Sequence, residues 1–163
     1  MNKLHKYINS NDTDINIRKY YPIGIKYYPK YIIRTYIKKY PTNYFEIGFI
    51  YQFYYNDYEL MHNYYNKAID EGNSKAMNNL GYYYEHIEKN YELMKKYYLD
   101  AIKLGNTYAM DSLGHYYDCE NNYTEMKYYY MSAIKLNYKI CMNNILDYYK
   151  KKLIFIMHNI TSM

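Results

Sequence analysis

Apolar and small residues in the second half of the chain recur at the spacing of a helical face, in two alternating kinds of stripe. The first kind, which we assign to a helix A, consists of Ala76, Met77, Leu80, Gly81 and Tyr84. The second kind, which we assign to a helix B, consists of Met94, Tyr97, Tyr98, Ala101 and Ile102. Spacings of three and four residues bring each set to one side of an α-helix. The pattern therefore predicts amphipathic helices that alternate along the chain.

Both stripes return at nearly constant intervals. The helix A segment 76–84 is repeated at 109–117, thirty-three residues later at every position. The helix B segment 97–102 is preceded by 64–69 and followed by 129–134, which comes one residue early. A period of this size is typical of stacked helical repeats, in which each unit packs on its neighbours. We therefore predict an all-α fold, a short α-solenoid of antiparallel helix pairs with about four repeats.

Glycine and asparagine mark the ends of the predicted helices. Gly72, Gly105 and Asn137 follow the three helix B stripes, where a helix often ends in a left-handed residue. Asn73 and Asn106 come directly after the two glycines and suit the N-cap of the next helix A. A second set of N-cap residues precedes the helix B stripes at Asp57, Asn90 and Asn122.

Three glycines lie inside the helix A stripes instead of at their ends, at Gly48, Gly81 and Gly114. Glycine in a helix interior costs about 1 kcal/mol relative to alanine. We expect the close approach of a neighbouring helix to offset that cost, because a β-carbon would block it.

The two ends of the chain depart from the repeat. Residues 1–20 are polar, and we expect a disordered or frayed segment there. We interpret residues 21–41 as a degenerate N-terminal capping segment, 42–152 as the repeats and 153–163 as a C-terminal cap or tail. Within the capping segment, we interpret Pro29 to Tyr40 as a degenerate helix B, because Pro29 suits a first helical turn and Pro41 a stop. The residues at the places equivalent to the helix B stripe are Tyr31, Ile32, Thr35 and Tyr36.

Helix A of the first copy is apolar on almost every side and carries a second stripe of Phe45, Phe49 and Phe53. This stripe has two interpretations. It is either the wall of a ligand site or a surface on which the preceding segment packs. We favour packing, because aromatic stripes at helical spacing are usually part of a core.

These residues resemble the Sel-one-like repeat (SLR) family, a relative of the tetratricopeptide repeat. The family pattern is similar to K-A-A-x-x-G-x-x-x-A-x-x-x-L-G-x-x-Y. Two copies match it at the same spacings, one at Ala68, Gly72, Ala76, Leu80, Gly81 and Tyr84 and the next at Ala101, Gly105, Ala109, Leu113, Gly114 and Tyr117. The last copy departs from the pattern, because Cys141, Ile145 and Leu146 stand where the family has alanine, leucine and glycine. The loop between helices A and B is also shorter than in the family.

The resemblance implies a protein–protein interaction scaffold or adaptor in which helix A lines a concave groove. The partner would be a protein or peptide held in that groove. By helical position, the outward residues of helix A are Asn78, Tyr82, His86, Asp111, His115, Cys119, Asn143, Asp147 and Lys151. Tyrosine and histidine suit recognition, because they are rigid and have both apolar and polar parts. The alternative is an ordinary solvated face rich in tyrosine.

The amino-acid composition explains a tyrosine-rich solvated face and also suggests a second function, RNA binding. The chain contains 31 tyrosines in 163 residues and has a net charge of +5. Its commonest residue types have codons rich in A and T, which is typical of an AT-rich genome such as that of a large DNA virus. Tyrosine and lysine also suit single-stranded RNA, which helical repeats can bind by stacking. Asp111, Asp118 and Asp147 argue against nucleic acid, so RNA binding is the second hypothesis.

The sequence carries no motif for catalysis or for a cofactor. It lacks a phosphate-binding glycine loop, H-E-x-x-H and G-x-S-x-G, and its five histidines have no common metal-ligand spacing. His115 and Cys119 are one helical turn apart and could form a thiolate–imidazole pair, but no residue nearby in sequence would orient the histidine. We therefore predict no enzymatic activity, no cofactor and no metal.

We expect no secretory signal, because Met1–Lys6 runs into polar residues, and no membrane-spanning segment, because the longest aliphatic run is 153–157. Its two cysteines form no disulfide framework. We expect a cytoplasmic protein, in the host cytoplasm if the chain is viral, with no membrane partner.

Overall fold

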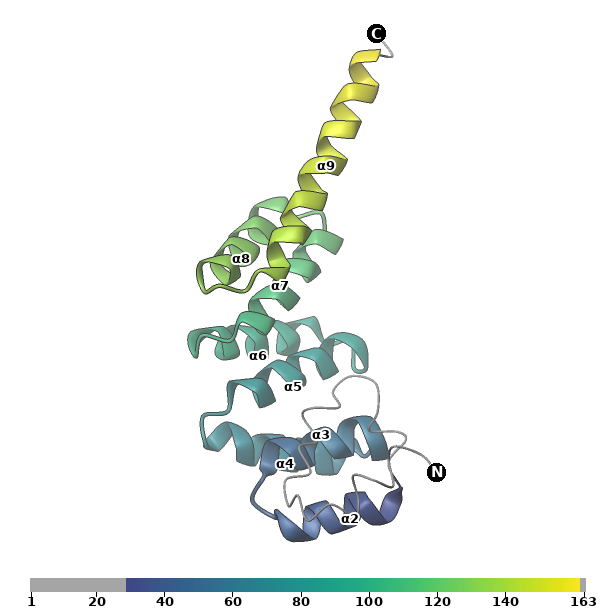
Figure 1. Ribbon diagram of the computed structural model, residues 1–163, viewed down its shortest axis with the longest axis vertical. Coiled ribbons are helices and arrows are strands. Elements are labelled where there is room, and N and C mark those ends of the chain that lie inside the picture. Colours follow the sequence, from purple (N-terminus) through teal and green to yellow (C-terminus); the bar gives the residue numbers. More distant parts are fainter. Residues whose placement is uncertain (1–28, 162–163) are drawn as a thin grey trace, which may run out of the picture. The chain divides into compact units, whose positions relative to one another are not determined.

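The computed structural model describes residues 29–161, and every regular element within them is a helix (Figure 1). The all-α prediction is confirmed for this part of the chain. The segment predicted at 1–20, and residues 21–28 of the capping segment, lie outside the described residues. The elements are α2 (Lys30–Lys39), α3 (Tyr44–Ile50), the π-helical turn η3 (Tyr51–Tyr55), α4 (Tyr58–Asp70), α5 (Ser74–His86), α6 (Tyr91–Lys103), α7 (Thr107–Cys119), α8 (Tyr123–Lys135) and α9 (Ile140–Thr161).

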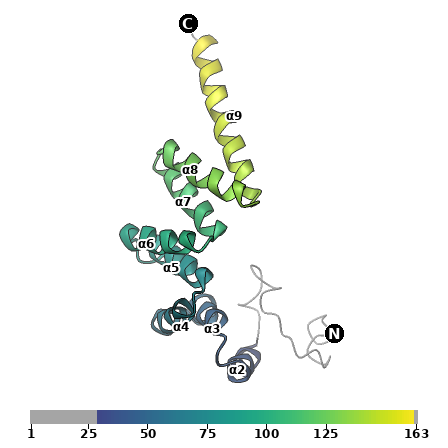
Figure 2. The ribbon, with the colours of Figure 1, turned by 90° about the vertical axis from the view of Figure 1, so that its left-hand side faces the viewer.

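The described helices fall into two compact units that divide between Glu71 and Gly72. The first unit contains α2 to α4, and the second contains α5 to α9. Within the units, α3 packs against α4, α5 against α6, and α7 against α8. Figures 1 and 2 show α5 beside α6 and α7 beside α8. Each helix from α4 to α8 has 13 residues, so the regular repeat in the sequence corresponds to helices of equal length.

Side-chain caps begin these helices at the predicted residues. The Asn73 Oδ1 accepts hydrogen bonds from the backbone N–H groups of Lys75 and Ala76, and the Asn106 Oδ1 accepts one from Ala109. Asp57, Asn90 and Asn122 cap the helix B elements α4, α6 and α8 in the same way. Each cap satisfies a backbone donor that the helix itself leaves unpaired.

The residues predicted to end the helix B elements adopt the left-handed conformation. The φ angles of Gly72, Gly105 and Asn137 are 79°, 75° and 65°. A residue without a β-carbon, or an asparagine, adopts this conformation at the lowest cost. This prediction is confirmed in all three copies.

A further left-handed residue occurs in each loop from helix A to helix B, and the sequence did not suggest it. These residues are Asn56, Lys89 and Asn121, with φ angles of 53°, 57° and 57°. Each directly precedes an N-cap residue. The loop between α5 and α6 spans 87–90, whereas the loop between α7 and α8 spans only 120–122. The one-residue slip in the period therefore arises in the second of these loops.

Each glycine inside a helix A receives a tyrosine ring from the following helix B. An ideal β-carbon on Gly81 of α5 would lie 2.5 Å from both Cδ1 and Cε1 of Tyr98 on α6. The expected close approach is therefore confirmed, and the group that approaches is an aromatic ring. The same contact recurs at Gly48 with Tyr65 and at Gly114 with Tyr130.

A second aromatic contact repeats one turn after each glycine. Tyr84 stacks on Tyr97 with 5.4 Å between ring centroids and 5° between ring planes. In the preceding copy, Tyr51 stacks on Tyr64 with a centroid distance of 5.4 Å and an interplanar angle of 8°. In the following copy, Tyr117 stacks on Tyr129 with a centroid distance of 5.7 Å and an interplanar angle of 2°. Three successive helix pairs therefore share both contacts.

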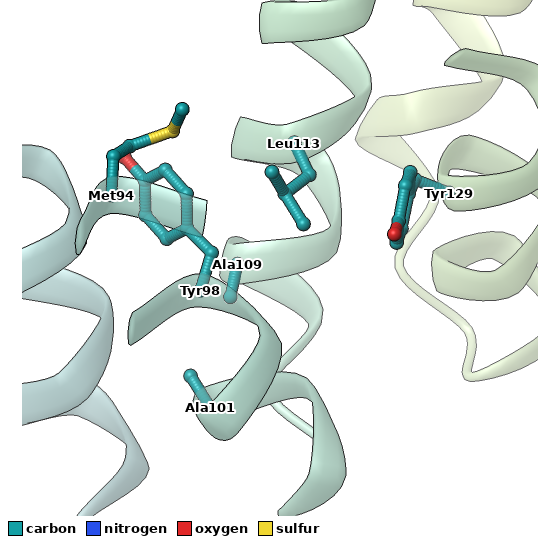
Figure 3. Packing of buried hydrophobic residues seen from close by; sticks show 6 residues of the cluster. All are labelled: Met94, Tyr98, Ala101, Ala109, Leu113 and Tyr129. Carbon is teal, nitrogen blue, oxygen red and sulfur yellow. The ribbon is translucent and has the colours of Figure 1, made fainter. Parts of the chain in front are cut away.

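The buried cluster between α6, α7 and α8 shows how large and small residues alternate (Figure 3). Tyr98 and Met94 are wholly buried, and Ala101, Ala109 and Leu113 complete the packing around them. A neighbouring cluster extends the core from α7 and α8 to α9 through Met110, Met126, Tyr130, Ala133 and Cys141. The core of the second unit is therefore continuous along the sequence of helices.

The α2 helix packs on α3 through a face different from the predicted one. Ile32 and Tyr36 are buried as predicted, but Tyr31 and Thr35 are exposed. Ile33 is buried and forms a hydrophobic cluster with Tyr36 and Ile50. The prediction was wrong at Tyr31 and Thr35 because it carried over the register of the later helix B elements. A helix that meets its neighbour with another face does not keep that register.

The phenylalanine stripe belongs mainly to the packing of the first unit. Phe45 and Phe49 are buried, and Phe45 stacks on Tyr65 of α4 with 6.0 Å between ring centroids. Phe49 contacts Phe53, with centroids 4.4 Å apart. Phe45 therefore takes part in the packing of the first unit against α4. The part of the preceding segment before residue 29 lies outside the described residues, so its packing on the stripe stays a prediction.

The last helix, α9, has 22 residues and continues through residues 153–161 without a break. Its first half packs on α8, and its second half extends beyond that helix in both views (Figures 1 and 2). Within residues 29–161, no helix combines the length and the apolar character needed to cross a membrane.

Candidate partner-binding surface

The residues predicted for the partner-binding groove lie on α5, α7 and α9, all in the second unit. On α5, Tyr82 is 41 % exposed, and its ring meets the exposed His86 ring edge-on with 4.2 Å between centroids. Asn78, one turn earlier, is half-buried, and its Oδ1 is buried without a hydrogen-bond partner among the described residues. The helix therefore presents an aromatic–imidazole pair to solvent beside an unsatisfied acceptor.

On α7, Asp111 connects two helices. Its Oδ1 accepts hydrogen bonds from Asn144 Nδ2 at 3.1 Å and from Cys141 Sγ at 3.2 Å. Both donors belong to α9, and Asp111 is half-buried between them. A carboxylate with two donors from the neighbouring helix holds α7 and α9 together, which the sequence did not predict.

The histidine and cysteine of α7 lie close together, as their spacing predicts. His115 Nδ1 and Cys119 Sγ are 3.9 Å apart, and both side chains are exposed. Within residues 29–161, no hydrogen bond links His115 to a carboxylate or an amide that would orient its ring. The same part of the chain brings no three histidine, cysteine, aspartate or glutamate side chains together as metal ligands.

On α9, Asn143, Asp147 and Lys151 are exposed. Asp147 lies 3.4 Å from the Lys150 Nζ, and both side chains are largely in water, so this ion pair contributes little to stability. The candidate surface thus divides into exposed residues on all three helices and two half-buried ones, Asn78 and Asp111.

The hydroxyl groups of the buried tyrosines have polar partners that the sequence reasoning missed. The Tyr65 hydroxyl donates to Gln52 Oε1 at 2.7 Å, and the Tyr98 hydroxyl donates to Glu85 Oε2 at 2.8 Å. Gln52 and Glu85 each stand four residues after a helix A glycine, and Asp118 has the same place in the third copy. An amide or acid at a fixed distance from the glycine was the signal that could have revealed these pairs.

The same surroundings keep several ionisable groups neutral. Burial, followed by the nearby charge and hydrogen bond of Glu85, raises the pKa of Tyr98 well above its usual value. Burial, followed by the charges of Asp111 and Asp118, raises the pKa of Tyr130. Burial and the hydrogen bond to Asp111 raise the pKa of Cys141 to about 12. These groups therefore serve the packing of the helices in their protonated forms.

The two cysteines are expected to differ in their reaction with a thiol reagent at neutral pH. Cys119 is exposed, whereas Cys141 is buried and its pKa is raised. Because only the thiolate reacts, we expect Cys141 to be modified at least about a hundredfold more slowly than Cys119 in the native protein. Mass spectrometry of timed samples measures both rates, and a Cys119→Ser variant isolates the slow one. Equal rates in the folded protein would contradict the buried position of Cys141.

The geometry defines an all-helical fold for residues 29–161, in which consecutive helices pack in neighbouring pairs. No protein-family model matches the sequence, and no curated protein or solved structure is significantly similar to the chain.

Proposed function

We propose that the chain is a non-enzymatic protein-binding scaffold, a short α-solenoid of antiparallel helix pairs built from about four Sel-one-like repeats. The observation that carries this proposal is the recurrence of the same two contacts in three successive helix pairs. In each helix pair, the ring of a helix B tyrosine packs against a helix A glycine. One turn after that glycine, a helix A tyrosine stacks on another helix B tyrosine. Because the glycine and tyrosine positions of helix A make this packing, the outward positions of helix A can differ between copies.

The binding surface in this proposal is formed by the outward residues of α5, α7 and α9. They differ from copy to copy, as expected for recognition. The α5 residues Tyr82 and His86 form one aromatic pair, and the α7 residues His115 and Cys119 form a second exposed group. An extended peptide could pack against Tyr82, whose side chain is 41 % exposed.

Replacing both Tyr82 and His115 with alanine tests this surface. Both side chains are exposed, so the helical circular dichroism should remain unchanged. We expect peptides selected from a displayed library by the wild-type chain to bind the double variant about tenfold or more weakly, because aromatic anchors contribute most of such binding energies.

Tyr31→Ala provides the matched control, because Tyr31 is 59 % exposed and belongs to α2 of the first unit, whereas the proposed surface belongs to the second unit. Peptide binding should survive this change. Undiminished binding by the Tyr82 and His115 double variant, or an equal loss with Tyr31→Ala, would refute the proposed groove.

A further inference from the structure

The α7 helix uses two faces to contact two helices. On α7, Ala109 and Leu113 pack toward α6, and Tyr116 contacts Tyr91 of that helix. The adjacent face contains Met110, Gly114 and Tyr117, and it meets α8 through Tyr130 and Tyr129. The first face therefore receives the preceding helix B, and the second face receives the following one.

The α9 helix has both faces, but among the described residues it packs on a neighbour through the first face alone. Cys141, Ile145 and Tyr148 correspond to the first face of α7 and pack on α8. Met142, Leu146 and Tyr149 correspond to the second face, and they are 48 %, 49 % and 51 % exposed. The face that a following helix covers on α5 and α7 is thus open on α9.

The open face continues to the end of the helix. Leu153, Ile156 and Ile160 follow Met142, Leu146 and Tyr149 at alternating spacings of three and four residues, and all three are exposed. At about 100° per residue, all six side chains fall within an arc of about 80°. Alternating spacings of three and four match the a and d positions of a heptad repeat, so this row has the pattern of a coiled-coil seam and is called the seam below.

The seam does not suit another helix of the internal kind. The internal contact needs a glycine, because the Tyr98 and Tyr130 rings lie where a β-carbon would be. In α9 the equivalent residue is Leu146, whose side chain fills that space. A seam with leucine or isoleucine at every a position from Leu146 onward instead suits a partner that carries the same row of side chains.

We propose that α9 pairs with the α9 of a second copy of this chain, through the seam Met142, Leu146, Tyr149, Leu153, Ile156 and Ile160. A two-fold arrangement brings the same apolar row from both chains together and covers the exposed side chains of both. Lys150 and Lys152 flank the seam, where their stems can cover its edge while their charges stay in water. The proposed partner-binding residues Asn143, Asp147 and Lys151 lie about 140° around the helix, so pairing leaves that surface open.

Sedimentation of the full chain over about a hundredfold range of concentration tests the pairing. The wild-type mass is expected to rise from 20.2 kDa toward twice that value. Leu153→Glu places a charge in the centre of the seam and is expected to weaken association at least about a hundredfold, because a buried unpaired charge is strongly unfavourable. Leu153 is 59 % exposed within one chain, so the variant should keep its helical circular dichroism.

Phe155→Glu and Lys151→Glu are the matched controls, since both residues are exposed on α9 but lie outside the seam. Both variants should dimerise like the wild type. A wild-type chain that stays monomeric at the highest concentration would overturn the proposal. So would open-ended association, an unchanged Leu153→Glu variant, or a Phe155→Glu variant that is equally impaired, because general stickiness of an apolar helix would then explain the result.

Discussion

Replacing Gly81 with alanine is expected to destabilise the chain by about 3 kcal/mol, although alanine is the better helix former. Helix propensity alone would give a gain of about 1 kcal/mol. The new β-carbon would lie 2.5 Å from two ring carbons of Tyr98, whose side chain is wholly buried. The ring has no free space, so α5 and α6 must separate. Urea unfolding followed by far-ultraviolet circular dichroism measures the change.

Gly105→Ala is the control for this substitution. Gly105 has a φ of 75°, and an added β-carbon there would meet no atom within 4 Å. Only the strain of a left-handed alanine remains, so we expect the free energy of unfolding to fall by about 1 kcal/mol. A Gly81→Ala variant as stable as the wild type would contradict the close approach of the ring.

The ring contact can be separated from other effects of the substitution by a double-mutant cycle. Tyr98→Leu removes the ring and should itself be destabilising, because it opens a cavity and frees Glu85. In the Gly81→Ala background the same change should be less harmful by about 1–2 kcal/mol, because it also relieves the clash. Strict additivity of the two changes would show that the ring is not the obstacle.

The second large effect is alkaline unfolding. Burial raises the pKa of Tyr98 and Tyr130 well above the ordinary value of 10.0, and it raises that of Tyr138 to about 12. Above pH 10 the unfolded chain loses these protons while the native chain still holds them. The unfolded state then binds fewer protons, so the free energy of unfolding falls as pH rises. The stabilisation is complete below pH 10 and is lost as pH rises through the higher native pKa values.

Two optical signals measured together test this expectation. The two signals are tyrosinate absorbance and far-ultraviolet circular dichroism. We expect Tyr98 and Tyr130 to ionise only together with the loss of helix. Ionisation of all 31 tyrosines with unchanged helicity would count against this view of the core.

Tyr98→Phe provides a matched variant for the alkaline transition. It removes one group of raised pKa without changing the ring that fills Gly81. The slope of stability against pH above pH 10 should therefore become less steep. Stability at neutral pH should fall by about 1–3 kcal/mol, because Glu85 loses a hydrogen-bond donor.

Sequence patterns predicted the local features of the fold most accurately. Asn73 and Asn106 cap α5 and α7, and Gly72 and Gly105 are left-handed, all as the sequence indicated. These features depend on residues only a few positions apart, so the pattern carries the information. The α2 helix shows the limit of this reasoning, because Tyr31 is exposed and Ile33 is buried in its place.

The candidate surface was less accessible to sequence reasoning. Helical position placed Asn78, Tyr82 and His115 on α5 and α7, but it treated Asp111 as an outward residue like the others. The structure instead ties Asp111 to Asn144 and Cys141. That contact joins residues about thirty positions apart, and no spacing within one helix reveals it.

By itself, the sequence determined that the chain forms helices, where most of them begin and end, and which positions must be small. Apolar periodicity, capping side chains and left-handed residues act within one or two turns. Only the tertiary structure decided what fills each small position. It showed the Tyr98 ring at Gly81, the Tyr98 hydroxyl on Glu85, and the exposed row of α9 from Met142 to Ile160. These contacts depend on how two helices cross, and a helix crossing is set jointly by side chains that no local pattern connects.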